Sequence, residues 1–154
     1  MPTVTTGLEN ICQSPSAFLQ QKRLGLLCNP ASVDRSFHHA KDLIDRFFPG
    51  QLTTLFSPQH GFYADKQDNM IESDDTVDKA ARRPIFSLYG KTRQPTAEMM
   101  ENIDILLVDL QDVGTRVYTF IYTLSYCREA AKKFGKKVIV LDRPNPIGGV
   151  EIEG

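Results

Sequence analysis

Several sequence patterns that identify common classes of enzyme are missing from this chain of 154 residues. The first strongly apolar run is followed by Cys28-Asn29-Pro30-Ala31-Ser32 and not by GxGxxG, and no GxxxxGK[ST] occurs, which argues against dinucleotide and P-loop phosphate binding. GxSxG and HExxH are also absent, so the sequence encodes neither a nucleophile elbow nor a zinc-protease helix. We therefore expect no metal and no organic cofactor.

Cysteine is scarce, and strong charge and long apolar runs are missing. Cys12, Cys28 and Cys127 are odd in number and widely spaced, so we expect reduced, mostly buried thiols rather than a disulfide framework or a metal site. The net charge of -1 gives no reason to expect nucleic acid or an anionic membrane as a partner. No run approaches the roughly 20 apolar residues of a membrane span, and residues 1–15 lack the pattern of a secretory signal. A soluble cytoplasmic protein is the expectation.

The remaining pattern alternates between strand and helix, which predicts an α/β fold of one domain. We expect an open, mostly parallel sheet of about four to five strands with helices on both faces. The strands are predicted at 23–28, 52–56, 103–110 and 137–141, with 84–90 either a strand or a packed loop. The helices are predicted at 8–21 with an interruption near Ser14-Pro15, at 37–48, from a cap at Thr96, and at 118–134.

Two segments do not fit this alternation. Residues 57–83 are polar and lack a period, and a loop of that length is usually functional or mobile. The chain stops at residue 154, directly after a turn rich in proline and glycine that follows a predicted strand. We expect either that the chain is a fragment or that a partner supplies the other wall of a site.

Three predicted strands run into polar loops, at 56–62, 109–116 and 141–149. In an open α/β sheet such loops gather at one edge, where ligands bind. Charges, amides and glycines at those positions indicate a site, because packing alone does not require them.

Two of these loops hold groups suited to proton transfer. His60 lies in a Pro-Gln-His-Gly turn and either orients a substrate or shuttles a proton, or is simply bonded within its loop. Asp109 and Asp112 flank Gln111, and either one could act as acid, base or acceptor for a sugar hydroxyl. The plainer alternative is an Asp–Arg pair with Arg116 that shapes the loop.

The other candidates are weaker on composition alone. Asp142 and Arg143 precede a stiff Pro144-Asn145-Pro146 turn that fixes the amide of Asn145. Tyr89 and Arg93 combine an aromatic face with a cation, a set suited to a sugar carrying a carboxylate, although a packed tyrosine beside a solvated turn is more common. Glu72 is an isolated weak candidate, and His38 and His39 are expected on the solvated side at a helix start.

Taken in order, these motifs resemble a known family. The segments that carry the resemblance are 24–34 (LGLLCNPASVD), 57–62 (SPQHGF), 87–90 (SLYG), 109–116 (DLQDVGTR) with Tyr118-Thr119, and 141–149 (LDRPNPIGG). The chain is similar over about residues 8–154 to the DUF1343 family, whose characterised members are exo-acting β-N-acetylmuramidases of the NamZ type that release N-acetylmuramic acid from peptidoglycan fragments.

The resemblance implies a Rossmann-like N-terminal domain over residues 1–154, with the family's second domain absent from this chain. In the family, the active site lies in the cleft between the two domains. The implied ligand is a muramyl saccharide or peptidoglycan fragment, and a missing C-terminal domain or a homo-oligomer would complete the site. The substrate-binding residues implied or suggested at this stage are His60, Gly61, Tyr89, Arg93, Gln111, Arg116, Asp142, Arg143 and Asn145.

The chain departs from the family at one position that matters for catalysis. Many members have Gly-Pro-Glu-His-Gly where this chain has Ser57-Pro58-Gln59-His60-Gly61, and the family's glutamate is its leading candidate acid. The carboxamide of Gln59 cannot transfer a proton, whereas glycoside hydrolysis needs a proton-transferring carboxyl group. Either Glu72, Asp65 or Asp112 takes that role, or the protein binds muramyl sugars without cleaving them. An interaction module completed by a partner domain is a further alternative.

Overall fold

A computed structural model describes residues 4–63 and 72–151 of the chain. They form one six-stranded sheet in the order β3-β4-β2-β1-β5-β6. The strands are β1 (Leu24–Cys28), β2 (Leu52–Ser57), β3 (Thr76–Asp78), β4 (Arg83–Ser87), β5 (Ile105–Asp109) and β6 (Lys137–Val140). The helices are α1 (Gly7–Gln13), a short 3₁₀ turn η1 (Ala17–Leu19), α2 (Ala40–Phe47), α3 (Ala97–Glu101) and α4 (Phe120–Lys133). All strand pairs are parallel except that of β3 with β4.

The two central strands are buried along their whole length. Every residue of β1 and of β5 is buried, as expected for strands covered on both faces. Their parallel register places Leu24 opposite Ile105 and Cys28 opposite Asp109. The carboxyl ends of both strands are therefore level, at the point where the polar loops begin.

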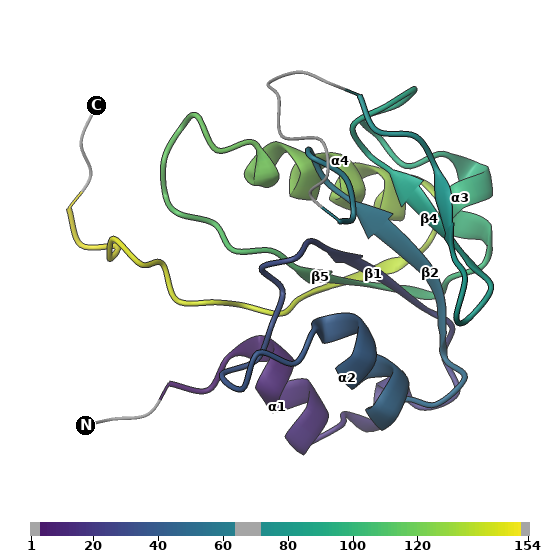
Figure 1. The fold of residues 1–154 in the computed structure, drawn as a ribbon, viewed down its shortest axis with the longest axis horizontal. Coiled ribbons are helices and arrows are strands. Elements are labelled where there is room, and N and C mark those ends of the chain that lie inside the picture. Colours follow the sequence, from purple (N-terminus) through teal and green to yellow (C-terminus); the bar gives the residue numbers. More distant parts are fainter. Residues whose placement is uncertain (1–3, 64–71, 152–154) are drawn as a thin grey trace.

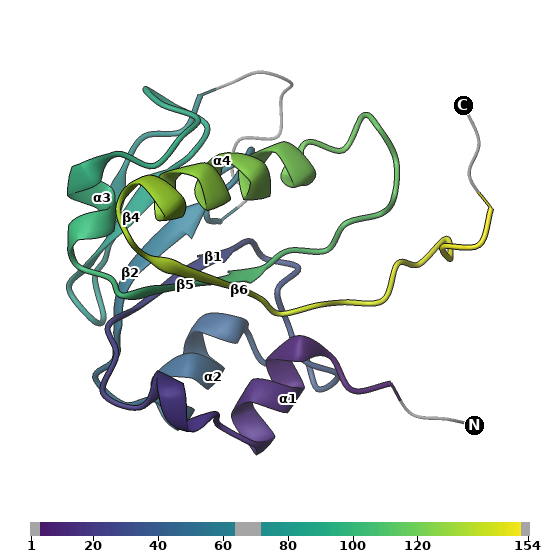
Figure 2. The same ribbon diagram turned by 180° about the vertical axis from the view of Figure 1, so that it is seen from behind.

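Helices cover both faces of the sheet (Figures 1 and 2). Helices α1 and α2 pack on one face, where Leu8, Ile11 and Ile44 join the inward side chains of the strands. Helices α3 and α4 pack on the other, where Met100, Cys127 and Ala131 do the same. The alternation of side chains along each strand divides the core into these two apolar layers.

The sequence at the helix ends explains where the helices begin and stop. Thr6 and Glu9 form a capping box at α1, and Thr96 Oγ1 accepts from the backbone N–H of Met99, as predicted for that helix start. Gly135 follows α4 with a φ of 66°, a conformation that favours glycine.

Two predictions about elements were wrong. The sheet has six strands rather than four or five, because the exposed edge strand β3 pairs with β4 inside the segment expected to be a loop. Phe37 does not begin a helix, since its φ is 62° and α2 starts at Ala40 with His39 as its N-cap.

Other expectations about the fold were confirmed. The structure has the predicted mostly parallel α/β architecture with helices on both faces. All three cysteines are free and buried, and burial raises the pKa of the Cys12 thiol to about 11. Within the described residues, no helix combines the length and the apolar character required to span a bilayer.

The strand order creates a reversal between β1 and β5. From β1 the chain moves outward through β2 to β4 and then returns to the other side of β1 with β5 and β6. The loops that follow adjacent strands on the two sides of such a reversal diverge and leave a crevice. We call the loops after β1, β2, β4, β5 and β6 the carboxyl edge; the segments after β5 and β6 extend well beyond the sheet there (Figure 1).

Candidate functional site

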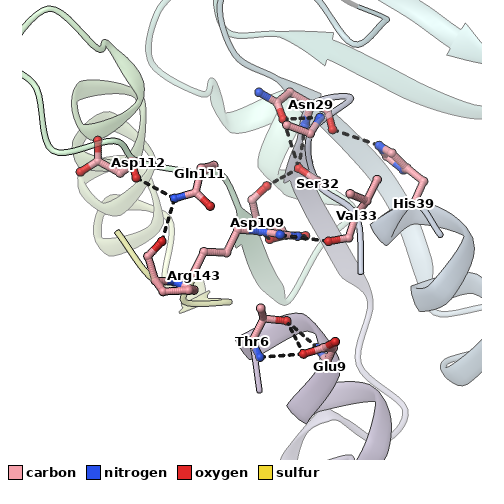
Figure 3. A network of polar contacts seen from close by, with 12 residues as sticks. Thr6, Glu9, Asn29, Ser32, Val33, His39, Asp109, Gln111, Asp112 and Arg143 are labelled. Carbon is pink, nitrogen blue, oxygen red and sulfur yellow. Dashed lines mark hydrogen bonds and ion pairs between the residues drawn. The ribbon is translucent and has the colours of Figure 1, made fainter. Parts of the chain in front are cut away.

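The centre of the carboxyl edge is a buried ion pair between Asp109, the last residue of β5, and Arg143, which follows β6. Arg143 donates from Nε to Oδ1 of Asp109 at 2.5 Å and from Nη2 to Oδ2 at 2.8 Å (Figure 3). Its Nη1 also donates to the carbonyl oxygen of Val33 at 2.9 Å. Burial raises the pKa of Asp109, although the Arg143 guanidinium opposes that effect. Arg143 therefore joins the loops after β1, β5 and β6.

The loop after β1 is fixed to the same point by short polar side chains. Ser32 Oγ donates to the backbone carbonyl of Asp109 and accepts from the backbone N–H of Asn29 at 3.0 Å. His39 Nε2 is 3.0 Å from the carbonyl oxygen of Asn29, and its Nδ1 accepts from the backbone N–H of Lys41. His39 is half-buried and caps α2, so its expected position on a solvated helix side was wrong. Ser32 and Asn29 thus hold the loop after β1 against the end of β5. Neither of them was predicted from the sequence as a site residue.

The loop after β2 makes a tight turn that presents Gln59 and His60. The backbone N–H of Gly61 donates to the carbonyl of Pro58 at 3.3 Å, and His60 and Gly61 have φ values of 75° and 79°. A positive φ is uncommon for histidine, and such conformations concentrate at functional sites. Gln59 Oε1 accepts from Thr119 Oγ1 at 2.9 Å, which links this turn to the start of α4.

The loop after β5 is joined to the loop after β6 by Gln111. Its Nε2 donates to the carbonyl of Asp112 at 2.7 Å and to the carbonyl of Pro144 at 3.1 Å (Figure 3). The Asp112 carboxylate accepts from the backbone N–H of Gly114 at 3.3 Å, and the residue as a whole is half-buried. Gln111 thus fixes the backbone at Asp112, and the carboxylate makes no ion pair within residues 4–63 and 72–151.

Asn145 and Gly114 touch across the same two loops. A Cβ atom added to Gly114, whose φ is 69°, would lie 2.4 Å from Asn145 Nδ2. Asn145 Oδ1 also accepts from the backbone N–H of Ile147 at 3.1 Å, which holds the turn between its two prolines. The positive φ of residue 114 and the close approach of the Asn145 side chain both favour glycine at this position.

The remaining predicted residues differ in their exposure and in the contacts that they make. Tyr89 is buried after β4, and the Arg93 guanidinium lies over its ring at 3.5 Å from the centroid, so Arg93 covers the face that a sugar would contact. Glu72 is exposed beside Ser73, while Asp65 lies outside the described residues. Arg116 and Asp142 are exposed, and the Asp142 carbonyl accepts from the N–H of Gly7 at 2.8 Å.

The groups at the carboxyl edge are amides, hydroxyls, carboxylates and guanidinium ions. Among the described residues, no cluster of three or more His, Cys, Asp or Glu side chains is arranged to hold a metal ion. Amides and carboxylates arranged in this way suit a ligand rich in hydroxyl groups, to which they can donate and from which they can accept. Among the groups that build the site, sequence reasoning missed Thr119, Ser32 and Asn29, although all three stand in the motif segments.

Comparisons with known proteins point to one family. Residues 24–154 match the family model described as Exo-beta-N-acetylmuramidase NamZ, N-terminal. The Peptidoglycan beta-N-acetylmuramidase NamZ of Bacillus subtilis (strain 168) is 46% identical over 153 residues, which cover 99% of this chain and 37% of that protein.

Two crystal structures of DUF1343 family proteins from Bacteroides fragilis NCTC 9343 have the same fold. One superposes with a TM-score of 0.87 at 40% identity, over 99% of this chain and 38% of the other. The second has a TM-score of 0.74 at 30% identity, over 94% of this chain and 36% of the other. The chain thus spans little more than a third of the length of these relatives.

Proposed function

This chain belongs to the NamZ exo-β-N-acetylmuramidase N-terminal family, and we propose that its carboxyl edge binds the muramyl end of peptidoglycan-derived saccharides and takes part in their hydrolysis. One observation carries the proposal. Gln59 of the loop after β2 is bonded to Thr119, and Gln111 of the loop after β5 is bonded to Pro144 of the loop after β6. These two hydrogen bonds link the three motif loops that follow β2, β5 and β6.

We assign the proton-transferring role to Asp112. Asp109 is buried and held by both nitrogens of the Arg143 fork, so it is not available to a ligand. Asp112 lies three residues farther along the chain, its backbone is fixed by Gln111, and its carboxylate makes no ion pair among the described residues. Glu72 is exposed next to Ser73, which is bonded to the carbonyl of Tyr89 on the flank formed by β4.

In that role the carboxyl group of Asp112 delivers its proton to the glycosidic oxygen as the bond to the anomeric carbon breaks. Water then adds its hydroxyl group to the anomeric carbon, and its remaining proton regenerates the carboxyl group. Gln59 hydrogen-bonds the sugar without exchanging a proton. His60 lies in the same turn as Gln59, closed by the hydrogen bond from the Gly61 N–H to the Pro58 carbonyl, and we assign it to the binding of the same sugar.

The test is hydrolysis of a chromogenic β-N-acetylmuramide by this chain and by two variants. We expect Asp112→Asn to lower kcat by at least 100-fold, within the range of general acid–base catalysis, about 10²–10⁴. Glu101→Gln is the control, because Glu101 is an exposed carboxylate at the end of α3 and is not part of the carboxyl edge. Turnover that survives Asp112→Asn would remove the assignment of Asp112.

Binding without cleavage is the second candidate, and Gln59 favours it. If the chain binds N-acetylmuramic acid but turns over no substrate, the Gln59→Glu variant decides the reason. Hydrolysis gained by that variant would identify the carboxamide as the cause of inactivity.

A further inference from the structure

A second inference rests on Phe37, an exposed aromatic residue in the loop after β1. Phe37 is 86% exposed, and its φ of 62° lies in the left-handed region. That conformation is unfavourable for a bulky side chain, by roughly 1–2 kcal/mol. An exposed aromatic ring kept in a strained backbone therefore needs an explanation other than packing.

The loop that carries Phe37 is rigidly built. Asp34 Oδ1 accepts from the backbone N–H groups of Ser36 and His38, both at 2.8 Å, and the Asp34 carbonyl accepts from the N–H of Phe37 at 3.0 Å. His38 Nδ1 lies 3.1 Å from Asp34 Oδ2, and Val33 pairs with His39 across the loop. These contacts fix the backbone of the loop that presents the ring.

Phe37 borders a hollow of about 460 Å³ that reaches the candidate site. Its other walls include Gln111, Arg143 and Pro144 on one side and Val4 and Arg35 on the other. We call this cavity the Phe37 hollow. Gln111 also donates to the backbone carbonyl of Asp112, so the hollow adjoins the loop that carries the proposed proton donor.

The charges around the Phe37 hollow are already compensated. Arg35 Nε lies 2.5 Å from Glu9 Oε1, and Arg35 Nη2 donates to the Val4 carbonyl at 3.1 Å. Arg143 is paired with Asp109. An anionic ligand would find no unpaired guanidinium among the described residues that line this hollow. Its chemistry suits an uncharged ring with one apolar face and a rim of hydroxyl groups.

We propose that the Phe37 hollow binds the neutral N-acetylhexosamine that is linked to the muramic acid, with one face of the sugar against the Phe37 ring. This inference rests on the proposed function, because it requires that the carboxyl edge binds a muramyl residue. An aromatic ring gives a large contact area at a small entropic cost, and a preformed loop lowers that cost further. Phe37 is then a specificity residue for the sugar on the leaving side.

The experiment is a calorimetric titration of this chain with N-acetylmuramic acid and with the N-acetylmuramyl-N-acetylglucosamine disaccharide. We expect the disaccharide to bind more tightly, and Phe37→Ala to weaken it by about tenfold, which corresponds to about 1.4 kcal/mol, without changing the affinity for the monosaccharide. Phe37→Tyr keeps the ring and should keep the tighter binding. Phe18→Ala is the matched control, because Phe18 is also exposed, at 49%, but does not line the hollow.

The other outcomes separate the two proposals. A disaccharide affinity unaffected by Phe37→Ala would overturn the proposal that the Phe37 hollow binds the hexosamine. It would leave the proposed function intact. A Phe37 effect seen only when the muramic acid carries a peptide would also overturn the assignment to a sugar. If neither saccharide binds, the proposed function fails and the inference fails with it.

Discussion

Thr119 Oγ1, at the start of α4, donates a hydrogen bond to Gln59 Oε1 at 2.9 Å, although 60 residues separate the two side chains in the sequence. Gln59 stands where the resemblance to the family implies a glutamate, and its carboxamide oxygen is held by the side chain at the end of another loop. The contact joins the loop after β2 to the end of the loop after β5 and holds the Gln59 side chain.

Replacement of Thr119 tests that contact. Thr119→Val removes the donor and keeps the shape, so we expect a loss of about 0.5–1.5 kcal/mol in unfolding free energy and weaker binding of muramyl saccharides. Thr119→Ser retains the hydroxyl group and should keep both. Chemical denaturation and calorimetric titration measure the two effects, and equal behaviour of the valine and serine variants would contradict the role of the hydroxyl group.

Arg143→Ala should be strongly destabilising. The variant leaves the buried carboxylate of Asp109 without its partner, and breaking a buried ion pair in this way costs about 3–5 kcal/mol. Arg116→Ala is the control, because Arg116 is exposed on the neighbouring loop and should change the unfolding free energy by less than about 0.5 kcal/mol. A loss below about 1 kcal/mol in Arg143→Ala would show that the pair does not hold the carboxyl edge together.

Gly114→Ala should disturb the site more than its conformation alone would explain. Gly114 and Gly50 have similar φ values, 69° and 75°, but an added Cβ would contact Asn145 only at position 114 and would meet nothing within 4 Å at position 50. Gly50→Ala therefore measures the conformational strain by itself. We expect Gly114→Ala to lose at least about 1 kcal/mol more stability than Gly50→Ala, as overpacking does, together with saccharide binding. Equal losses in thermal denaturation would mean that the contact with Asn145 is easily relieved.

Stability should fall at acid pH through Glu9 and Asp104. The hydrogen bond from Arg35 lowers the pKa of Glu9 to about 2, and the hydrogen bond from Arg23 lowers the pKa of Asp104 to about 2. Groups with a depressed pKa stabilise the fold above their ordinary pKa and lose that contribution as the pH falls through the folded value. The loss attributable to these groups should therefore lie between about pH 4.5 and pH 2.

The Glu9→Gln variant isolates one of these contributions. Its unfolding free energy, from urea denaturation at several pH values, should decline less than that of the unchanged chain over the same interval. We expect a difference of no more than about 1 kcal/mol, because Arg35 is half exposed and solvent screens the pair. Parallel curves for the two proteins would contradict the assignment.

The core of the fold could be predicted because its strands are buried on both faces. Before Asp109, the apolar runs of β1 and β5 contain no polar residue that would confuse the period. The caps at Thr96 and Gly135 have local chemical causes. Strand β3 gave no such signal. It is three residues long, its first two residues are exposed, and only its pairing with β4 makes it a strand.

The site was harder to predict because its contacts join residues distant in the sequence. Asp109 and Arg116 are close in the sequence, yet the buried partner of Asp109 is Arg143, which the adjacent strand β6 delivers. Phe37 continued the apolar period of a helix, whereas hydrogen bonds to Asp34 hold it in a loop outside that helix. The spacing of apolar residues reports the average environment of a segment. It does not show that local hydrogen bonds to one side chain, here Asp34, keep a residue out of the helix.

The most direct measurement is the change in the side-chain amide resonances of glutamine when a muramyl disaccharide is titrated into the ¹⁵N-labelled chain. We expect the NH₂ signals of Gln59 and Gln111, which lie on the carboxyl edge, to shift together and to saturate at one affinity. Gln51, which precedes β2 at the opposite edge and donates to the carbonyls of Leu19 and Lys22, should stay unchanged. Saturable shifts at Gln51 without shifts at Gln59 and Gln111, or no shift at any of the three, would contradict saccharide binding at the carboxyl edge.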